Sequence, residues 1–345
     1  MTTVRLGNID ISRFVVAIPR IAEQTADYGQ LLVMDMPTLT GENSQGFWHE
    51  RNPSSPFHGA DINEMFINIE HDDLLVWTGL IQGIRSDGSA KTAEITLRSE
   101  IQRKLDSGCI YVSGTATNPS DTPAGIARAI CELYGIPIDS SSFGQSHGIY
   151  TVDNVLLSST MITPETTIRD ALQQLAQIGA ARIFWSDGRM HFDVWTNTLT
   201  PPIAIFTDTA ALALASIPAV GRLMTPPTIE PLEKQVTNGY SVQWLGGSAD
   251  FGTEPISISA GPDAPFQIRS LQGAVWLGER WLDYMQTAQQ RISFAVSAQY
   301  GRGLKLGYPV GIEYTTGAWS SIETVDIVSI DNSSPLISLI TGLTR

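Results

Sequence analysis

One segment of this chain occurs twice, and that repeat constrains the fold more than any other feature. The first copy is LIQGIRSDGS at Leu80–Ser89, followed by Ile-Thr-Leu at Ile95–Leu97. The second copy is VDIVSIDNSS at Val325–Ser334, followed by Ile-Thr-Gly-Leu at Ile340–Leu343. Both predict an apolar strand, a turn that begins at Asp, and a returning strand. Two explanations fit this repeat: a duplicated β-domain, or two unrelated hairpins that share turn chemistry.

The first hundred residues have the pattern of β-strands. Residues Met65–Ile69 alternate between two faces, and Leu74–Ile84 is a long apolar run interrupted by two glycines, which suit bulges or bends in a barrel. We therefore predict an N-terminal β-barrel over residues 1–105. Within it, Gly41–Ala60 is polar and contains two prolines. This segment predicts a long loop that serves contacts with partners rather than the core.

The pattern changes after residue 105. Thr122-Pro123 is a helix start, because Thr caps a helix and Pro fits its first turn. Further helices are predicted over Pro164–Ile178 and Ser270–Thr287, and a hairpin over Ala181–Trp195 turns at Asp-Gly. The predicted fold class is β-rich α+β, with two similar antiparallel β-barrel domains and an intervening α/β region. We place the α+β middle region at residues 106–226 and 262–303, and the second barrel at residues 227–261 and 304–345.

Charge argues against several classes of function. The chain has 345 residues, with 21 Lys and Arg against 35 Asp and Glu, and a formal net charge of −14. Binding to nucleic-acid phosphates or to anionic membranes requires the opposite sign. No stretch of about 20 apolar residues is present, and the start lacks the order of a signal peptide. We therefore expect synthesis in the cytosol and no membrane segment. Only 16% of residues are charged, which indicates surface that is hidden in an assembly.

One motif suggests a nucleophile. Gly144–Gly148 matches G-x-S-x-G, which in hydrolases places a serine on a turn between a strand and a helix. Here the preceding residues are polar, the following ones look extended, and His191 is the only later histidine. We predict instead that Ser146 lies on an exposed polar loop and that the chain has no catalytic residue.

Candidate metal and cofactor sites do not have the spacing that such sites need. The acidic run Glu70–Asp73 lacks the pattern of a calcium loop, and with Glu64 it shows no sign of a sugar-binding cleft. Cys109 and Cys131 cannot form a zinc site by themselves, and the five histidines are scattered. We predict no metal and no cofactor.

Two further sets of residues have structural explanations. Gly301, Gly303 and Gly307 follow a predicted strand, as in a phosphate loop, but no helix pattern opens after them, so a turn between strands is favoured. Three tryptophans with apolar neighbours suit core packing or a subunit interface, namely Trp244, Trp276 and Trp281.

The order of these pieces resembles the hub proteins of long-tailed bacteriophages, which belong to baseplates and tail tips. The resemblance rests on the end of the first β-domain, a short helix, a helix that leads into a hairpin, and the C-terminal strands, at Trp77–Ser99, Thr122–Ile138, Thr166–Trp195 and Arg302–Leu343. It extends over nearly the whole chain and favours duplication as the origin of the repeat.

The resemblance implies a homotrimer whose two barrels per subunit form a pseudo-sixfold ring around the DNA channel. The expected partners are the tail tube or a distal-tail protein on one side and spike, fibre or tip-closing proteins on the other. The protein would be located in the virion after assembly in the host cytoplasm, with DNA passing through and no specific nucleic-acid binding. This chain ends soon after its second predicted barrel, so no enzymatic domain is expected.

Two alternatives remain open at this stage. A distal-tail ring protein or another tail adaptor would share the barrel, and it would form six copies rather than three. A hydrolase acting on cell-wall material would need a cleft with convergent acids, of which the sequence gives no sign.

Overall fold

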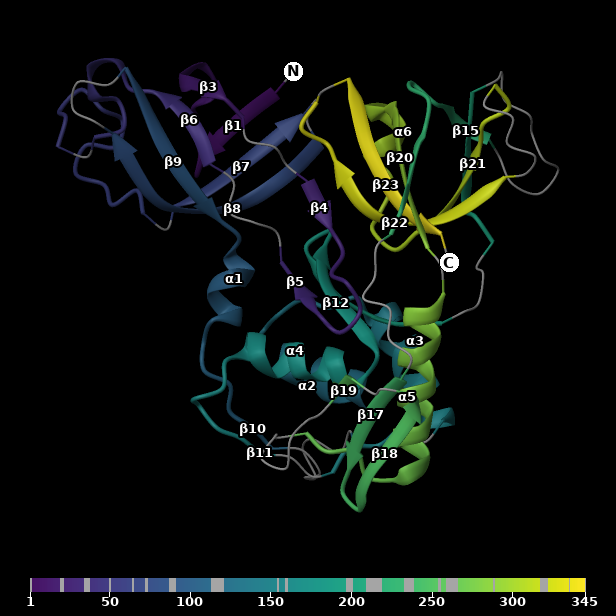
Figure 1. Cartoon of the computed structure of the whole chain (residues 1–345). Coiled ribbons are helices and arrows are strands. Elements are labelled where there is room, and N and C mark those ends of the chain that lie inside the picture. Colours follow the sequence, from purple (N-terminus) through teal and green to yellow (C-terminus); the bar gives the residue numbers. More distant parts are fainter. Residues whose placement is uncertain are drawn as a thin grey trace.

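Two curled β-sheets lie side by side above a third part that mixes helices with short sheets (Figure 1). The structure is a computed structural model. It describes residues 2–18, 22–33, 38–49, 51–63, 65–71, 74–86, 91–112, 121–153, 155–158, 161–196, 201–208, 219–232, 239–253, 256–258, 266–287, 289–316, 322–334 and 336–344.

The first sheet is antiparallel and has the strand order β2-β1-β7-β8-β9-β6-β3. Its alternating sequences place one face in a core: in β9, Ala93, Ile95 and Leu97 are fully buried while Glu94 is exposed. The strands are β1 (Thr2–Leu6), β2 (Ile9–Asp10), β3 (Val15–Ala17), β6 (Thr38–Glu42), β7 (Phe66–His71), β8 (Leu74–Ser86) and β9 (Thr92–Arg98).

The second sheet is mixed and has the order β15-β14-β21-β22-β23-β20-β16, with β4 as an additional partner of β22. Strands β14 and β15 run parallel to their neighbours, and the others pair antiparallel. The strands are β4 (Ala22–Gln24), β14 (Ala204–Thr207), β15 (Ala219–Arg222), β16 (Thr228–Pro231), β20 (Gln290–Ser297), β21 (Pro309–Glu313), β22 (Glu323–Asp331) and β23 (Ile337–Thr344).

Four consecutive strands have the same arrangement in both sheets. In the first sheet, β6, β7, β8 and β9 occur in space as β7-β8-β9-β6, and in the second, β20, β21, β22 and β23 occur as β21-β22-β23-β20. All neighbouring pairs in these two sets are antiparallel. The first strand of each set thus returns beside the last, and we call each set a four-stranded unit.

The repeated segment forms the central hairpin of each unit, and even its irregularity is repeated. The ladder between β8 and β9 shifts register between Ile81 and Gly83, and the ladder between β22 and β23 shifts between Ile327 and Ser329. Directly after each shift a threonine is the partner, Thr96 in the first unit and Thr341 in the second. The two copies therefore occupy equivalent places in their sheets, as duplication predicts.

The prediction of two barrels needs correction, because both sheets are curled half-barrels that remain open. Alternation in the sequence defines which face of a strand is buried, but it does not define how many strands join or whether the ends meet. The β-rich α+β class is confirmed. Parallel strands at one end of the second sheet were not predicted, because the sequence pattern of a short strand is the same in both directions.

The prediction that Gly41–Ala60 is a loop without core residues is wrong. After β6 and the short 3₁₀ helix η2 (Ser44–Gly46), the chain buries Phe47, Trp48 and Phe57 against the first sheet. Trp48 and Phe57 stack with ring centroids 5.7 Å apart, and the Trp48 indole donates to the Glu42 carbonyl at 3.1 Å. Polar residues dominate the composition of this segment, so its three aromatic residues, which belong to the core of the first sheet, were not recognised as core residues.

The middle region contains helices packed on short sheets. Thr122 caps α2 by accepting from the Gly125 amide at 3.1 Å, as predicted, and Thr167 caps α4 in the same way. The elements are α1 (Glu100–Leu105), β10 (Tyr111–Val112), α2 (Pro123–Leu133), α3 (Ser140–Val152), β11 (Met161–Ile162), α4 (Ile168–Ile178), β12 (Ala181–Ser186), β13 (Arg189–Val194), β17 (Gly239–Trp244), β18 (Gly247–Gly252), β19 (Ile256–Ile258) and α5 (Leu271–Gln286).

Strand pairing departs from the predicted boundaries in two places. Strands β18, β17 and β19, in that order, form a separate sheet, and β17 and β18 pack on α5 instead of joining the second sheet. Conversely, β14, β15 and β20 belong to the second sheet although they were assigned to the middle region. An apolar strand pattern identifies a strand but not its partner, and the partners here are distant in sequence.

The N-terminal region also leaves its own sheet. Between β3 and β6, residues 22–33 run down from the first sheet past the second sheet and into the middle region, as β4 and β5 (Leu31–Leu32) in Figure 1. We call residues 22–33 the N-terminal strap. The predicted domain 1–105 therefore contains a segment that pairs with both other parts of the chain.

Candidate functional site

The strap is the place where the three parts of the molecule meet. Its strand β4 pairs antiparallel with β22, joining Gln24 to Ser329 and Ala22 to Asp331, while β5 pairs parallel with β12. Its sharp bend at Gly29 has a φ of +82°, and a Cβ there would lie 2.7 Å from the Trp281 ring. Glycine is needed at this position both for the backbone conformation and for the close approach.

Hydrogen bonds hold the strap against the middle region. The Gly29 amide donates to the Ala181 carbonyl at 2.6 Å, and the Ile183 amide donates to the Gln30 carbonyl at 3.0 Å. The Gln173 side chain makes two bonds: its amide donates to the Gly29 carbonyl at 2.6 Å, and its oxygen accepts from the Leu31 amide at 2.7 Å. The backbone of Gly29–Leu31 is therefore satisfied by α4 and β12 rather than by the first sheet.

A buried arginine lies at the centre of this junction. Arg182 on β12 is only 3% exposed and forms an ion pair with Asp193 at 2.8 Å. Its guanidinium also donates to Thr25 of the strap at 3.3 Å and lies 4.8 Å from the centre of the Tyr28 ring. Burial alone would lower the pKa of Arg182, but Tyr28, Asp193 and Asp326 together raise it, so the charge persists. One cation thus links the strap to the hairpin through direct contacts.

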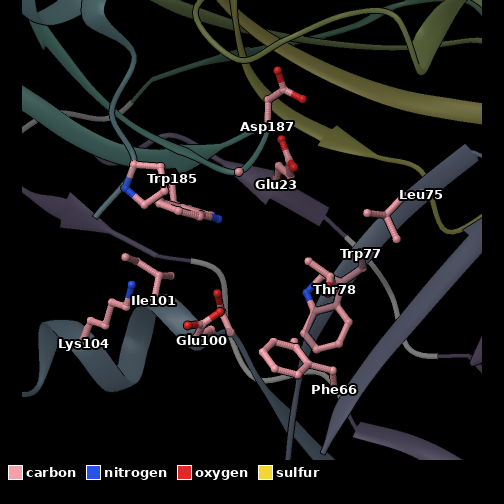
Figure 2. Close-up of a pocket in the computed structure, with 14 residues that line it drawn as sticks. Glu23, Phe66, Leu75, Trp77, Thr78, Glu100, Ile101, Lys104, Trp185 and Asp187 are labelled. Atoms are coloured by element: carbon pink, nitrogen blue, oxygen red, sulfur yellow. The ribbon is translucent and has the colours of Figure 1, made fainter. Parts of the chain in front are cut away.

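A cleft opens beside the strap, between the first sheet and the middle region, and it measures about 450 Å³. Figure 2 shows Phe66, Leu75 and Trp77 on strands of the first sheet facing Trp185 of the hairpin across this space. Phe66 and Leu75 are 51% and 56% exposed. The wall also contains carboxylates and one amine, contributed by Glu23, Glu100, Asp187 and Lys104.

Three of the charged groups of the cleft are engaged in structural bonds. Glu23 accepts from the Ser186 hydroxyl at 2.7 Å, and Asp187 pairs with Lys305 at 2.6 Å. Lys104 donates to the Gly135 carbonyl at 2.9 Å. Burial raises the pKa of Glu23, and the bond from Ser186 opposes that rise. Each of these three groups is thus bonded to a different structural partner, namely the hairpin, the second sheet and the end of α2, which is not the arrangement of a catalytic set.

The prediction of an exposed loop at Ser146 is wrong. Ser146 lies in the middle of helix α3, is 3% exposed, and donates its hydroxyl to the Phe192 carbonyl at 2.9 Å. The buried face of α3 consists of Phe143, Ser146 and Tyr150 at helical spacing. Such a helix was missed because the middle position of its stripe is polar. A nucleophile elbow needs its serine on a turn, so this geometry does not match the motif.

The histidines near Ser146 have other contacts. The His147 Nδ1 lies 2.6 Å from the Thr122 hydroxyl. His191 lies 3.2 Å from the Asp139 carboxylate and stacks on the Phe184 ring. Burial lowers the pKa of His191, and Asp139 opposes that effect. Both rings are held by structural partners, and neither contact is with the Ser146 hydroxyl.

The remaining predicted sites have these positions. Glu70 forms an ion pair with Arg5 at 3.7 Å, whereas Glu64, Asp72 and Asp73 lie outside the described residues. Cys109 and Cys131 are buried free thiols, and burial raises the pKa of Cys109 to about 11. Among the residues that the structure describes, no group of three or more His, Cys, Asp or Glu is placed to hold a metal ion.

The glycine segment connects strands, as predicted, but with a short helix, α6 (Ala298–Gly301), between β20 and β21. The tryptophans belong to the core of the middle region: Trp281 is buried and donates to the Gln177 carbonyl at 3.1 Å, while Trp244 and Trp276 pack on its edge. None of the helices in the described parts of the chain is long and apolar enough to cross a membrane.

Comparisons by sequence identify no relative: no family model matches the chain, and no curated protein matches it. Comparison by structure finds proteins of similar fold. A tail protein from Neisseria meningitidis MC58 aligns with a TM-score of 0.57 and 12% identity, covering 100% of this chain and 96% of that one. The 43 kDa tail protein of prophage MuSo2 from Shewanella oneidensis aligns with a TM-score of 0.53 and 13% identity, covering 99% and 97%. This chain is therefore similar in fold to tail proteins over its whole length.

Proposed function

We propose that this chain is a structural subunit of a bacteriophage tail tip or baseplate, and that it forms a homotrimeric hub ring. The observation that carries the proposal is the pair of four-stranded units in one chain, which share strand order and register shift. Three copies would present six such units. That is the simplest way for a subunit present three times to meet a sixfold tail tube.

Similarity of fold to two tail proteins over almost the full chain supports the same role. On this proposal the ring joins the tail tube, or a distal-tail protein, to spike, fibre or tip-closing proteins, and it lines the channel through which DNA is ejected. The net charge of −14 suits a channel that does not retain a polyanion. The protein would belong to the virion, after assembly in the host cytoplasm.

A non-enzymatic role fits the geometry at Ser146, whose hydroxyl is committed to a backbone carbonyl inside a helix. The alternative of a cell-wall hydrolase has a direct test. Purified protein and a Ser146→Ala variant are assayed on esterase substrates and on peptidoglycan. Activity that disappears in the variant would overturn the structural role.

Copy number tests the hub against the distal-tail ring. We expect native mass spectrometry of the protein, or symmetry analysis of isolated tails, to give three copies. Six equivalent copies would assign the chain to a distal ring. A monomer both in solution and in the particle would refute the ring.

A further inference from the structure

The long central strand of the second sheet is paired along both sides. One side of β22 pairs with β23. The other side pairs first with β21, over residues Glu323–Asp326, and then with β4 of the strap, over Ser329–Asp331. The strap therefore completes the ladder beyond the end of β21, and the Thr25 amide adds a bond to the Val328 carbonyl at 2.8 Å.

The equivalent strand of the first sheet lacks this last partner in the described residues. One side of β8 pairs with β9, and the other pairs with β7 only over Leu74–Leu80. Beyond that point no described strand pairs with Gly83–Arg85 on the β7 side. Gln82 and Arg85 are exposed, and Gly83 and Ile84 are half-buried.

The two strands can be compared residue by residue because their hydrogen bonds match. The Ile81 amide donates to the Met65 carbonyl at 3.1 Å, and the Ile327 amide donates to the Tyr308 carbonyl at 3.0 Å. Counting from this bond, Gln82 corresponds to Val328 and Ile84 to Ile330. The Val328 carbonyl accepts from the Thr25 amide of the strap, and peptide groups of alternate residues face the same neighbour in an antiparallel ladder, so the Ile330 peptide groups also face β4. By this correspondence, the Gln82 carbonyl and the Ile84 peptide groups face the side of β8 where no described strand pairs.

The register shift does not explain the open edge. Bulges and charged residues often protect the edge of a sheet from unwanted pairing. However, β22 has the same shift, between Ile327 and Ser329, and it accepts β4 immediately afterwards. The first unit therefore has the backbone geometry that accepts a strand in the second unit.

The position of the edge indicates what fills it. In Figure 1, β4 enters the second sheet from the side of the first sheet, whereas the end of β8 lies on the side of the first sheet that faces away from the second. In the proposed ring, a neighbouring copy related to this chain as the first sheet is related to the second would bring its second sheet beside β8.

We propose that the open edge of β8 at Gln82–Arg85 is a docking site for a β-strand from a second copy of this chain. The inference rests on the proposed ring, and it specifies one of the contacts that close it. A strand that adds to a sheet edge gains main-chain hydrogen bonds regardless of side-chain identity. The contact would repeat between copies the pairing that β4 makes within each chain.

Hydrogen exchange of the full-length protein, read at single amides, tests the contact. The Ile330 amide, which β4 already covers, should be protected at every protein concentration. The Ile84 amide should exchange rapidly in dilute monomer and become protected on assembly. Equal, rapid exchange of Ile84 in monomer and assembly would overturn the docking site.

A variant pair tests the energetic role of the same amide. Ile84→Pro removes the outward N–H, which the ladder to β9 does not use, and Ile84→Val keeps it. We expect Ile84→Pro to weaken association about tenfold, because the one main-chain hydrogen bond donated by this N–H is lost and the proline ring stands where the added strand would pair, and Ile84→Val to leave association nearly unchanged. Circular dichroism and the protection of Ile330 show whether the variant is folded.

The outcomes separate this inference from the proposed function. A trimer in which Ile84 stays unprotected and tolerates proline would refute the docking site while the ring stands. A chain that is monomeric in solution and in tails would refute both. Both proposals are supported if the protein is a trimer in which the Ile84 amide is protected and if the Ile84→Pro variant no longer forms that trimer.

Discussion

The two sheets share a four-stranded unit but are completed in different ways. Between the first and second strands of the unit, the first sheet has a long segment that inserts Phe47, Trp48 and Phe57 into its core. The second sheet has only α6 and a few turns at the equivalent place. The central strand of the second unit receives the strap, and that of the first receives no described strand at the matching site. The shared strands define the architecture, and the connections give each sheet its own core and its own edges.

Among the tests of this difference between the two sheets, Trp48→Ala should have the largest effect. Trp48 is 2% exposed, and removal of a buried tryptophan costs about 3–5 kcal/mol. We expect that loss in the free energy of unfolding, with hydrogen exchange accelerated in the first sheet more than in the second. Tyr300→Ala on α6, whose side chain is 39% exposed, should cost about 1 kcal/mol or less. Similar losses for the two variants would show that the long segment is not part of the first core.

Arg182→Met tests whether the strap attaches through its buried cation. The change leaves Asp193 without its charged partner, and breaking a buried pair costs about 3–5 kcal/mol. Asp193 remains 31% exposed, so we expect the lower end of that range, together with faster exchange of the amides of β4 and β5. Arg128→Met removes an exposed pair with Glu132 and should cost about 0.5 kcal/mol or less. An equal effect of the two changes in denaturant unfolding would argue against the role of Arg182.

Gly301→Ala tests the short connection of the second sheet. An added Cβ would overlap the Ser338 side chain of β23, so we expect a loss of about 1–3 kcal/mol from overpacking. Gly303→Ala is the matched control, because its Cβ would find the Tyr300 carbonyl at 3.6 Å, an ordinary contact. Thermal unfolding of both variants measures the difference. If Gly301→Ala were as stable as the control, the close packing of α6 on β23 would be disproved.

The smallest expected effect concerns Glu23, where the strap contacts the hairpin turn. Its raised pKa means that the folded state holds this proton more tightly than the unfolded state. The associated stability is fully present below the unfolded value near 4.5 and is lost as the pH rises through the folded pKa. Glu23→Gln should therefore be more stable than the parent at neutral pH and about equal to it at pH 4. If the difference in free energy of unfolding between Glu23→Gln and the parent were the same from about pH 4 to pH 7, the raised pKa of Glu23 would be contradicted.

The sequence predicts the local elements of this fold well because their signals are local. Strand β9 alternates cleanly, Thr122 and Pro123 identify the start of α2, and the Asp-Gly turn joins β12 to β13. Helix α3 was missed because Ser146 occupies the middle of its buried stripe. Its start does have a signal, since Asp139 caps it by accepting from the Ser141 amide at 2.9 Å.

The junction could not be predicted, because its contacts join residues that are far apart in the chain. Arg182 and Thr25 are separated by 157 positions, and no sequence pattern connects them. The same reason explains why β17 was assigned to the wrong sheet: pairing is decided by which edges meet in space. The repeated segment did predict that its two copies occupy equivalent places in their sheets, because that prediction needs only the similarity of two local sequence patterns.

The strap also determines the order in which the molecule can be completed during synthesis. Its residues leave the ribosome early, but their partners in β22 are made about three hundred residues later. At roughly 5–20 residues per second, β4 waits on the order of 15–60 s before its partner strand exists. The pairing of β4 therefore requires β22, and a chain that stops before residue 323 lacks the strand that holds this part of the strap to the second sheet.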